Sequence, residues 1–441
     1  MKRAAIVAII MMLCLPALHA QTQTLSLDEA IKMGLANSKE LKLAGQKIQE
    51  AVVQVEVARK KSLPTASATA GYSHALMLTR SFGLPSSDGQ DPKSIEFPFD
   101  NALYQATLSI NEPIYAAHKY EYAREQASLL LQLSKMDAEK NQQEVIYAIV
   151  NSYINYHTIL QNLKVLQQNL DDINQKLDEI KKFESQGLAT RNDVLRYELQ
   201  QSEIKLQLED LENNRQIANY SMNILLGLPD SADLRVEDIS YRLDAGAGFS
   251  DFLQQAVKNR TEFRSIDYNK QLAEIDIKNI KADRMPEIGL GGSLYYINPT
   301  QPLFPKGGSY LAPFVAGLNL KWNISSLYQA KTKLAAATNR KEQVYSRESI
   351  LSDEIKTEVY SAYQQYQQSL SRIKVYETSV TQAEENERIM ESKYKNNLAT
   401  TTDRIDAQTL LYRARINVEL SKASATQAYY NLLKVTGQLH P

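Results

Sequence analysis

Cysteine is almost absent from this chain of 441 residues, and the single one, Cys14, stands near the start. It falls inside residues 1–20, which have the pattern of a secretory signal peptide: two basic residues, an apolar run, and a small-residue cleavage site that ends at Ala20. The two residues before Cys14 are large, whereas the signal of a bacterial lipoprotein has small residues there. We therefore expect a mature chain without cysteine or lipid anchor, which excludes disulfides, thiol catalysis and cysteine-ligated metals.

A dominant charge sign is also lacking. The 50 Lys and Arg residues fall to 48 without Lys2 and Arg3, against 51 Asp and Glu residues. A surface for nucleic acid needs concentrated positive charge, so no such partner is expected. The five histidines are scattered, and no two have the i, i+4 spacing of a helical metal site. No convergent nucleophile, base or metal set is visible, so we expect no enzyme, no metal and no cofactor.

Long apolar runs and helix breakers are both scarce after the signal peptide. No stretch approaches the ~18 apolar residues of a transmembrane helix, so an integral membrane role would depend on strands. Glycine and proline are both missing between Pro113 and Gly187, and again between Gly317 and Gly437. Ordinary globular helices have ~10 to 20 residues, whereas a helix of about seventy residues would be ~105 Å long. We therefore expect very long helices.

The chain contains an internal repeat. Sliding the sequence by 210 residues aligns residues 188–190, Leu-Ala-Thr, with the identical residues 398–400, and places Asp193 on Asp403. This one offset holds without a gap from the second expected strand of each half through the last helix. Each half therefore has the same plan of strand, long helix, turn and returning helix.

Upstream of these elements the offset becomes 222, which aligns Pro64 with Pro286. The twelve-residue difference falls between strands, at 74–100 in the first half and 298–312 in the second, where a surface loop tolerates insertions. The predicted first repeat, at 21–228, has a helix at 26–62, strands at 64–73 and 101–112, and a helical hairpin at 114–228. A linker follows at 229–249. The predicted second repeat, at 250–441, has a helix at 251–285, strands at 286–297 and 313–323, and a helical hairpin at 324–437.

Four segments of about ten residues alternate between apolar and polar side chains, as half-buried strands do. In the first of them, alternate residues from Ala66 to Tyr72 share one face, and small polar residues or glycine occupy the other. Tyr72, Tyr104, Tyr296 and Trp322 stand near the strand ends, where a membrane barrel carries its interfacial aromatic belt.

A barrel with a lipid-facing outside and a wet lumen accounts for this alternation, and the edge of a soluble β-sandwich is the alternative. Four strands cannot close around a lumen, and open sheet edges do not persist in lipid. If the strands span a membrane, several chains must therefore share one barrel.

The long segments carry the heptad spacing of coiled coils. The first-half seam follows intervals of 3, 4, 3, 4 and 3 residues and consists of Leu163, Leu166, Leu170, Ile173, Leu177 and Ile180. The returning segment has a compatible phase, which predicts two antiparallel helices that zip together. In the second half, Glu387 interrupts the corresponding seam near the tip. Either the seam is weaker there and easier to open, or the helix rotates so that water solvates Glu387.

Each hairpin is expected to turn at residues 187–190 or 397–400. Gly187 and Asn397 belong to the two residue types that tolerate the left-handed conformation at the end of a helix. Both turns are therefore expected to end the first helix in the same way.

A threonine and an aspartate follow each turn at the spacing of an N-terminal helix cap. Thr190 and Thr400 can cap the returning helices, and Asp193 and Asp403 stand three positions farther on. Capping alone accounts for these two aspartates. It does not account for Asp406, which lies one turn deeper on the same face as Asp403.

The repeat, strand pairs, long helices and tip motifs together resemble the TolC-like outer-membrane efflux proteins over the whole mature chain. The resemblance implies an α+β membrane protein in which a homotrimer forms a twelve-strand β-barrel continuous with a periplasmic α-barrel. Such a trimer lies in the bacterial outer membrane and exports substrates from a periplasmic membrane-fusion adaptor and an inner-membrane pump. The alternative is a structural coiled-coil spacer of the cell envelope, which would need the heptads but not the four strands.

The resemblance also implies roles for residues at the tips. Asp403 and Asp406 occupy the positions of two aspartates that build charged rings at the family's pore entrance. Threefold symmetry would bring six carboxylates to one axis, where mutual repulsion and cation attraction are both large. Tyr394 and Asp193 match the pair that holds neighbouring hairpins closed, and opening would swing the second-half hairpins outward.

Two residues depart from the family pattern. Ala399 stands where some members carry a gate arginine, and Arg404 lies between the two aspartates. The expected adaptor-docking tips are Gly187, Leu188, Asn397 and Leu398.

Overall fold

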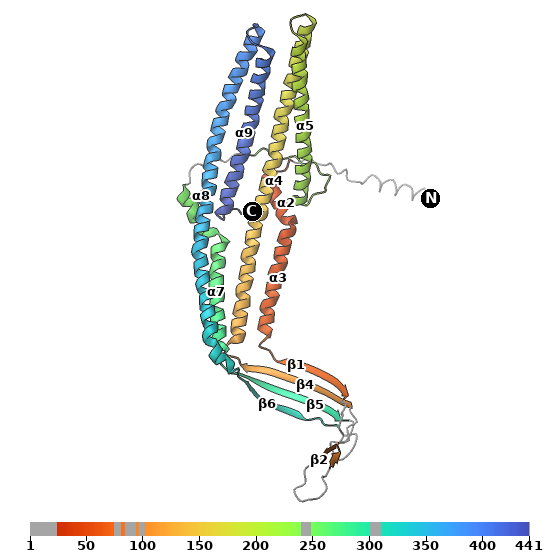
Figure 1. The fold of residues 1–441 in the computed structure, drawn as a ribbon, viewed down its shortest axis with the longest axis vertical. Helices are drawn as coiled ribbons and strands as arrows, with labels where there is room; N and C mark the ends of the chain where they lie inside the picture. The colour runs from red at the N-terminus through yellow and green to blue at the C-terminus, as the bar shows by residue number, and fades with distance from the viewer. Residues whose placement is uncertain are drawn as a thin grey trace, which may run out of the picture. The chain divides into compact units, whose positions relative to one another are not determined.

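The computed structural model describes residues 24–74, 81–83, 94–96, 102–239, 248–299 and 310–440, and the expected signal peptide lies outside them. The elements, in chain order, are α2 (Leu27–Asn37), α3 (Lys39–Lys60), β1 (Thr65–His74), β2 (Ser81–Gly83), β3 (Ser94–Glu96), β4 (Ala102–Tyr115), α4 (Lys119–Ser185), α5 (Arg191–Leu226), α6 (Phe249–Asn259), α7 (Thr261–Ala282), β5 (Glu287–Pro299), β6 (Phe314–Lys321), α8 (Ser325–Lys395) and α9 (Thr401–Val435) (Figure 1). Among the described helices, none combines the length and apolarity needed to cross a membrane.

The chain divides into two compact units. The hairpin unit contains Met1–Gly45, Asp137–Phe263 and Ile350–Pro441, and the sheet unit contains Gln46–Met136 and Arg264–Ser349. Each unit draws on both halves of the repeat, so sequence halves and structural units do not coincide.

The sheet unit is built on a four-stranded antiparallel sheet with the order β1-β4-β5-β6. Its register places Ala68, Leu108, Leu294 and Phe314 side by side across the four strands, on the face that the alternation predicts to be apolar. On the other face, the Ser293 hydroxyl donates a hydrogen bond to the Ser109 hydroxyl at 3.1 Å. Strands β2 and β3 form a separate pair within the segment that the sequence places in a loop.

The two short predicted helices, at 26–62 and 251–285, are each broken into two, so the expectation of single helices is wrong. Ser38 and Arg260 have extended backbone at the breaks, with ψ of 120° and 128°. Ser38 then starts α3, because its hydroxyl accepts a hydrogen bond from the Leu41 amide at 3.2 Å.

The C-terminal end of a returning helix packs against each break. Gly227 has a left-handed φ of 72°, and a Cβ added to it would lie 2.7 Å from the Cβ of Asn37. The Asn37 side chain also donates a hydrogen bond to the Leu226 carbonyl at 2.7 Å. Gly437 has a φ of 68°, and a Cβ added to it would lie 3.0 Å from the carbonyl carbon of Asn259. We call these two contacts the notches; the second is the repeat of the first.

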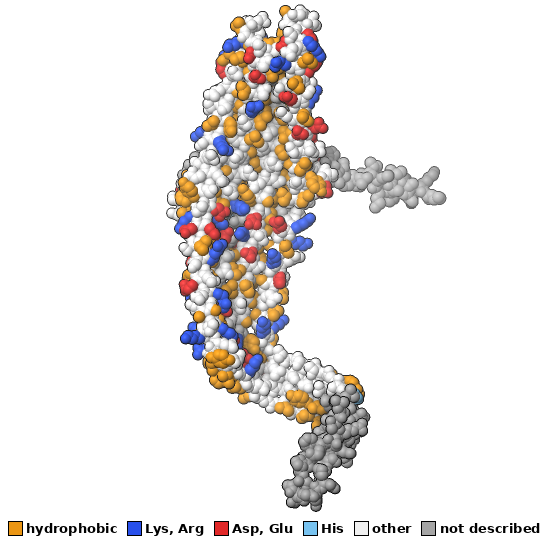
Figure 2. Space-filling model, viewed as in Figure 1, with side chains coloured by type: hydrophobic (Ala, Val, Ile, Leu, Met, Phe, Trp, Pro, Cys, Tyr) orange, Lys and Arg blue, Asp and Glu red, His pale blue; other side chains and the backbone are white. Residues whose placement is uncertain are grey.

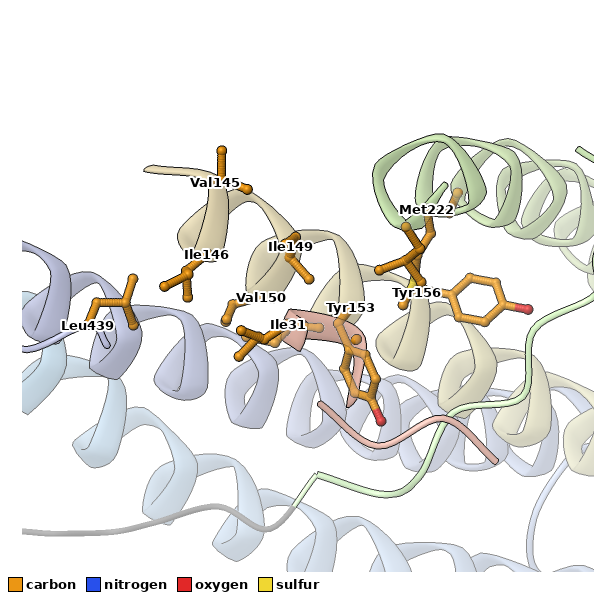
Figure 3. Packing of buried hydrophobic residues seen from close by; sticks show 13 residues of the cluster. Ile31, Val145, Ile146, Ile149, Val150, Tyr153, Tyr156, Met222 and Leu439 are labelled. Carbon is orange, nitrogen blue, oxygen red and sulfur yellow. The ribbon is translucent and has the colours of Figure 1, made fainter. Parts of the chain in front are cut away.

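The main core of the hairpin unit joins α2, α4 and α5. Figure 3 shows members of this cluster: Ile31 from α2, Ile149 and Tyr153 from α4, and Met222 from α5, which lies beside Tyr156. The Tyr153 hydroxyl donates to the Leu25 carbonyl at 2.8 Å, which ties the N-terminal segment to α4.

A second core, among α6, α8 and α9, follows the same plan. Members of the two cores that are 210 residues apart include Val145 and Ile355, Ile149 and Val359, Tyr156 and Tyr366, and Met222 and Leu432. The repeat therefore specifies the packing as well as the order of the elements.

Candidate functional site: the tips of the two hairpins

Two turns of the same design close the hairpins (Figure 1). Gly187 has φ of 75°, and the following amide, of Leu188, donates to the Phe183 carbonyl at 2.8 Å, which closes a Schellman motif. Asn397 has φ of 58°, and the Leu398 amide makes the equivalent bond at 2.8 Å. Leu188 and Leu398 are 73% and 76% exposed. Both turns thus hold a leucine out into solvent from a hydrogen-bonded turn.

The predicted caps are confirmed. Thr190 and Asp193 form a reciprocal capping box, and Thr400 and Asp403 form another, in which the aspartate accepts from the threonine amide at 2.9 and 2.8 Å respectively. Hydrogen bonds from the backbone and side chain of Thr400 hold the pKa of Asp403 below its usual value. Burial alone would raise the pKa of Asp193, but bonds from Thr190 and Thr401 lower it.

The two aspartates expected at the gate lie on the uncovered side of α9. Asp403 and Asp406 are both exposed, together with Leu410 one turn farther along. The opposite side of α9 is buried and includes Arg404, Ala407, Leu411, Ala414 and Val418. The carboxylates therefore face away from the contact between the hairpins.

The residues expected to lock the hairpins each contact a different residue of α9. Asp193, on the first hairpin, accepts a hydrogen bond from Thr401 at the start of α9 on the second. The Tyr394 ring lies under the guanidinium of Arg404, 4.7 Å from ring centroid to guanidinium carbon. Arg404 thus occupies a central place that the sequence pattern did not predict.

Arg404 is 3% exposed and binds carboxylates from both hairpins. Its Nε donates to Glu391 of α8 at 2.5 Å, and its Nη2 donates to Glu391 and to Glu179 of α4, both at 2.9 Å. Burial alone would raise the pKa of Glu391, but the bonds and charge of Arg404 and the charge of Lys176 keep it below the usual value.

Lys176 of α4 makes the reciprocal contact. Its Nζ lies 3.0 Å from Glu387 and 4.0 Å from Glu391, both on α8. Glu387 is therefore partly buried against Lys176 and is not turned into solvent, whereas the weaker seam expected at this position stays a prediction. We call the set of Lys176, Glu179, Glu387, Glu391 and Arg404 the tip cluster.

Polar contacts continue between the hairpins below the tip cluster. The Tyr412 hydroxyl of α9 donates a short hydrogen bond to Asp172 of α4, and Gln408 donates to Asn169 at 3.4 Å. Within the described part of the chain, the buried Tyr197 hydroxyl and Arg404 Nη1 have no hydrogen-bond partner. The region between the hairpins is therefore polar, and not all of its groups are satisfied.

The first hairpin, by contrast, has its own apolar core near the tip. Its buried members all come from α4 and α5: Ile173, Leu177, Ile180, Val194, Tyr197 and Ile204. At the 210-residue offset, Val194 corresponds to Arg404 and Leu177 to Glu387. The sequence signal for the tip cluster was therefore available as two charges at positions where the other half has core residues.

Of the four aromatic residues expected at the strand ends, the three tyrosines lie in the sheet and Trp322 directly follows β6. Tyr72 and Tyr104 are cross-strand partners with ring centroids 5.0 Å apart, and Tyr296 stacks on Tyr310 at 5.6 Å. The Trp322 indole donates to a backbone carbonyl at the end of the helical region before β5, at 3.0 Å.

The tips carry charges of both signs, as Figure 2 shows. In the described part of the chain, no group of three or more His, Cys, Asp or Glu residues is arranged to hold a metal ion. The chemistry available at the tips is therefore that of ion pairs, caps and exposed carboxylates.

Comparisons with known proteins agree with this architecture. The sequence profile of the family described as outer membrane efflux protein matches residues 30–228 and 252–438. Nodulation protein T of Rhizobium leguminosarum bv. trifolii is 22% identical over 425 residues, which cover 93% of this chain and 84% of that relative.

Solved structures share the fold at low sequence identity. CusC has a TM-score of 0.75 at 14% identity, covering 93% of this chain and 92% of that one. The CmeC outer membrane channel of Campylobacter jejuni has a TM-score of 0.74 at 15% identity, covering 93% of this chain and 85% of that one. Because the family match spans both repeats and most of the sequence, this chain belongs to the outer membrane efflux protein family.

Proposed function

We propose that this chain is one subunit of a homotrimeric outer-membrane conduit, gated in the periplasm by its hairpin tips. The observation that supports this most is the four-stranded sheet, in which neither edge strand, β1 or β6, has a further partner among the described strands. An unpaired backbone group in lipid costs several kcal/mol. Pairing β1 of one copy with β6 of the next would remove both edges, and three copies would supply the twelve strands of a closed barrel.

The exposed apolar face of the sheet supports a lipid contact. Leu108, Leu294, Phe314 and Leu318 share this face and are all at least 44% exposed. A contiguous apolar surface of this kind marks a contact with a membrane or another protein.

The aromatic residues fit two membrane interfaces. Tyr104 and Tyr296 lie toward one end of the sheet, whereas Trp322 follows β6, whose last residue pairs with Glu287 at the start of β5. The run from Glu287 to Tyr296 spans about 30 Å along the strand at ~3.3 Å per residue. A strand tilt near ~45° reduces this to about 21 Å along the membrane normal, close to the ~25 Å apolar band of outer-membrane barrels.

The gate would be formed by Asp403 and Asp406. They share the exposed side of α9 near its first turn, and three copies around one axis would present six carboxylates to the entrance. Such a ring attracts cations strongly and resists further approach of like charges. Divalent cations should therefore bind there and block the entrance.

The exposed tip leucines would be the adaptor-docking residues. Leu188 and Leu398 project from rigid Schellman turns, and an apolar anchor held in one conformation binds a pocket at low entropic cost. A photo-crosslinking residue at position 398 should capture a periplasmic adaptor. If Leu398→Arg leaves capture from position 188 unchanged, the docking assignment is wrong.

The conduit is tested with the purified mature protein. Unheated protein should migrate in detergent gels as a heat-modifiable trimer, and it should conduct in planar bilayers. The double substitution Asp403→Ala with Asp406→Ala should raise single-channel conductance and weaken block by divalent cations. Glu385→Ala, an exposed carboxylate on α8, is the matched control and should leave block unchanged.

Two outcomes would contradict different parts of the proposal. Unchanged divalent block in the double variant would refute the gate assignment but not the conduit. Absence of both trimer and conductance would refute the conduit and favour a structural spacer.

A further inference from the structure

A pocket lies in the hairpin unit where the N-terminal segment and the linker meet helices α4, α8 and α9. Its volume is about 340 Å³, within the ~300–1,000 Å³ range of pockets that hold small ligands. The α9 residues that line it, between 425 and 433, lie toward the C-terminal end of that helix, whereas the hairpin tip is at its start. The pocket therefore belongs to a region that has no part in the expected gate or in adaptor docking.

Four tyrosines line this pocket, and we call it the tyrosine pocket: Tyr153, Tyr366, Tyr429 and Tyr430. The last three rings are in contact in a row, with centroids 5.6 Å apart for Tyr366 and Tyr429 and 5.7 Å apart for Tyr429 and Tyr430. Their planes are inclined by 46° and 74°, so the rings present faces in different directions. Rings at such angles can contact a cation on more than one side, as in the aromatic cages that bind methylated ammonium groups.

The charged residues that line the tyrosine pocket are all acidic. They are Asp28, Glu237 and Asp238, and the described lining residues include no lysine, arginine or histidine. Asp238 lies 3.1 Å from the His157 Nε2 atom and accepts a hydrogen bond from the Gln161 amide at 2.8 Å, but both contacts use its Oδ1 oxygen. The Oδ2 oxygen has no part in them. A cation in the pocket would therefore be attracted by ring faces and by carboxylates.

The start of α2 also lines the pocket, and the N terminus of a helix ordinarily attracts anions. Here the protein supplies the anion itself. The Glu29 carboxylate accepts a hydrogen bond from the Ser26 amide at 3.0 Å and completes the capping box of α2. The partial positive charge of this helix end is therefore already compensated.

The repeat shows what the equivalent surface does in the first half. At the 210-residue offset, Tyr366 corresponds to Tyr156 and Tyr429 corresponds to Asn219. Tyr156 donates a hydrogen bond to the Leu234 carbonyl at 2.8 Å, and the Asn219 side chain donates to another linker carbonyl at 2.6 Å. The linker thus packs on these positions in the first half, whereas the same positions border a pocket in the second half.

We propose that the tyrosine pocket binds a small organic cation with a methylated ammonium group. Such a group is attracted to ring faces and carboxylates, and it requires no hydrogen-bond acceptor at a fixed position. The bound cation would connect the tyrosines of α9 to Asp28 and Glu237, and would stabilise the N-terminal segment and the linker against the second hairpin. The proposal does not depend on the proposed function, because binding is measured whether or not the protein conducts.

The test uses choline and the full-length mature protein in a non-ionic detergent. In titrations followed by saturation-transfer NMR, choline should bind at least about tenfold more tightly than 3,3-dimethylbutan-1-ol, which has the same shape but no charge. Choline should also slow hydrogen exchange at the Leu25 and Glu237 amides, which join the N-terminal segment to the linker with bonds of 2.7 and 3.1 Å. Exchange at the Leu398 amide, at the tip, should not change.

Substitutions separate the contribution of the rings from that of the carboxylates. Tyr429→Leu should weaken choline binding by about fivefold or more, whereas Tyr429→Phe should retain it because the ring face remains. Tyr220→Leu is the matched control, since Tyr220 is the exposed repeat equivalent of Tyr430 and does not line the pocket. Glu237→Gln should weaken binding about twofold or more, and Glu385→Gln, an exposed carboxylate elsewhere on α8, should not.

The outcomes decide whether the site exists. Equal affinity for choline and 3,3-dimethylbutan-1-ol would overturn the proposal, and so would equal effects of Tyr429→Leu and Tyr220→Leu. Choline binding without slower exchange at the Leu25 and Glu237 amides would place the cation elsewhere and would also overturn it. If Tyr429→Leu does not fold, Tyr430→Leu is compared with the same control. A protein that binds choline as expected but does not conduct would contradict the proposed function alone.

Discussion

The notch between Gly227 and Asn37 offers a sharp test of how the hairpin unit is held together. Gly227→Ala forces a side chain into a left-handed backbone at φ of 72°, which costs about 1–2 kcal/mol. Its Cβ would also lie 2.7 Å from Asn37 Cβ and 2.8 Å from Asn37 Cγ. Rotation of the asparagine side chain does not move its Cβ, so the backbone around Asn37 must shift, and the side chain loses its bond to the Leu226 carbonyl, which costs about another 1 kcal/mol.

The sum is about 2–3 kcal/mol for Gly227→Ala. Gly187→Ala supplies the matched control, because Gly187 has nearly the same φ, 75°, but nothing lies within 4 Å of an added Cβ. It should cost only the backbone contribution of about 1–2 kcal/mol. The difference between the two variants therefore isolates the contact with Asn37.

Hydrogen–deuterium exchange measures the local loss of stability in each of the two variants, and it does not require reversible global unfolding. The Leu228 amide is bonded to Asn223 at 2.9 Å and the Leu188 amide to Phe183 at 2.8 Å, so each reports the opening of its own helix end. Exchange at Leu228 in Gly227→Ala should accelerate on the order of 30- to 150-fold, against about 5- to 30-fold at Leu188 in Gly187→Ala. Equal acceleration in the two variants would refute the notch as a packing constraint.

Three further predictions concern the tips and the sheet. The contacts of Glu391 with Arg404 and Lys176 depress its pKa, so these contacts favour its charged form. If they hold the hairpins of the proposed channel together, its open probability should stay flat from neutral pH down to the ordinary glutamate value of 4.5 and rise as the pH falls further, and a rise centred near neutral pH would contradict a role for the tip cluster. Thr400→Val removes the cap of α9, so amides in its first turn should exchange about fivefold faster, with no change at the first-hairpin tip. Trp322→Ala should lower the temperature at which the trimer dissociates in detergent, whereas Trp322→Tyr should retain most of it; equal loss in both would show that the indole bond to the backbone, not the interfacial ring, is what matters.

Local sequence patterns were sufficient to predict the strands, the long helices and their caps. Alternation gave the apolar face of the sheet, missing glycine and proline gave the long helices, and the spacing from Thr190 to Asp193 and from Thr400 to Asp403 gave both caps. Each of these signals lies within a few residues of the structure it specifies. Physical rules for single helices and strands therefore apply directly.

The breaks at Ser38 and Arg260 could not be predicted in this way. Residues on both sides have good helical periodicity, and the break is stabilised by a helix end that arrives from far along the chain, at Gly227 or Gly437. Only the assembled fold brings these residues together.

The tip cluster was missed for a different reason. Arg404 was recognised only as a departure from the family pattern, because its partners Glu179 and Glu391 lie on two other helices. In the repeat, Arg404 is equivalent to the buried Val194, so it is a charged residue at a core position. In a repeat protein, one half thus indicates whether the equivalent position of the other half is expected to be buried or exposed.

The capping box at the start of α9 gives one carboxylate two physical roles. Asp403 accepts the hydrogen bonds that start the helix, and it also carries the charge that faces outward at the tip. Asparagine could keep most of the cap while removing the charge from the tip, and no common residue could do the reverse at this short reach. A substitution at this position can therefore spare the helix start and still remove the charge.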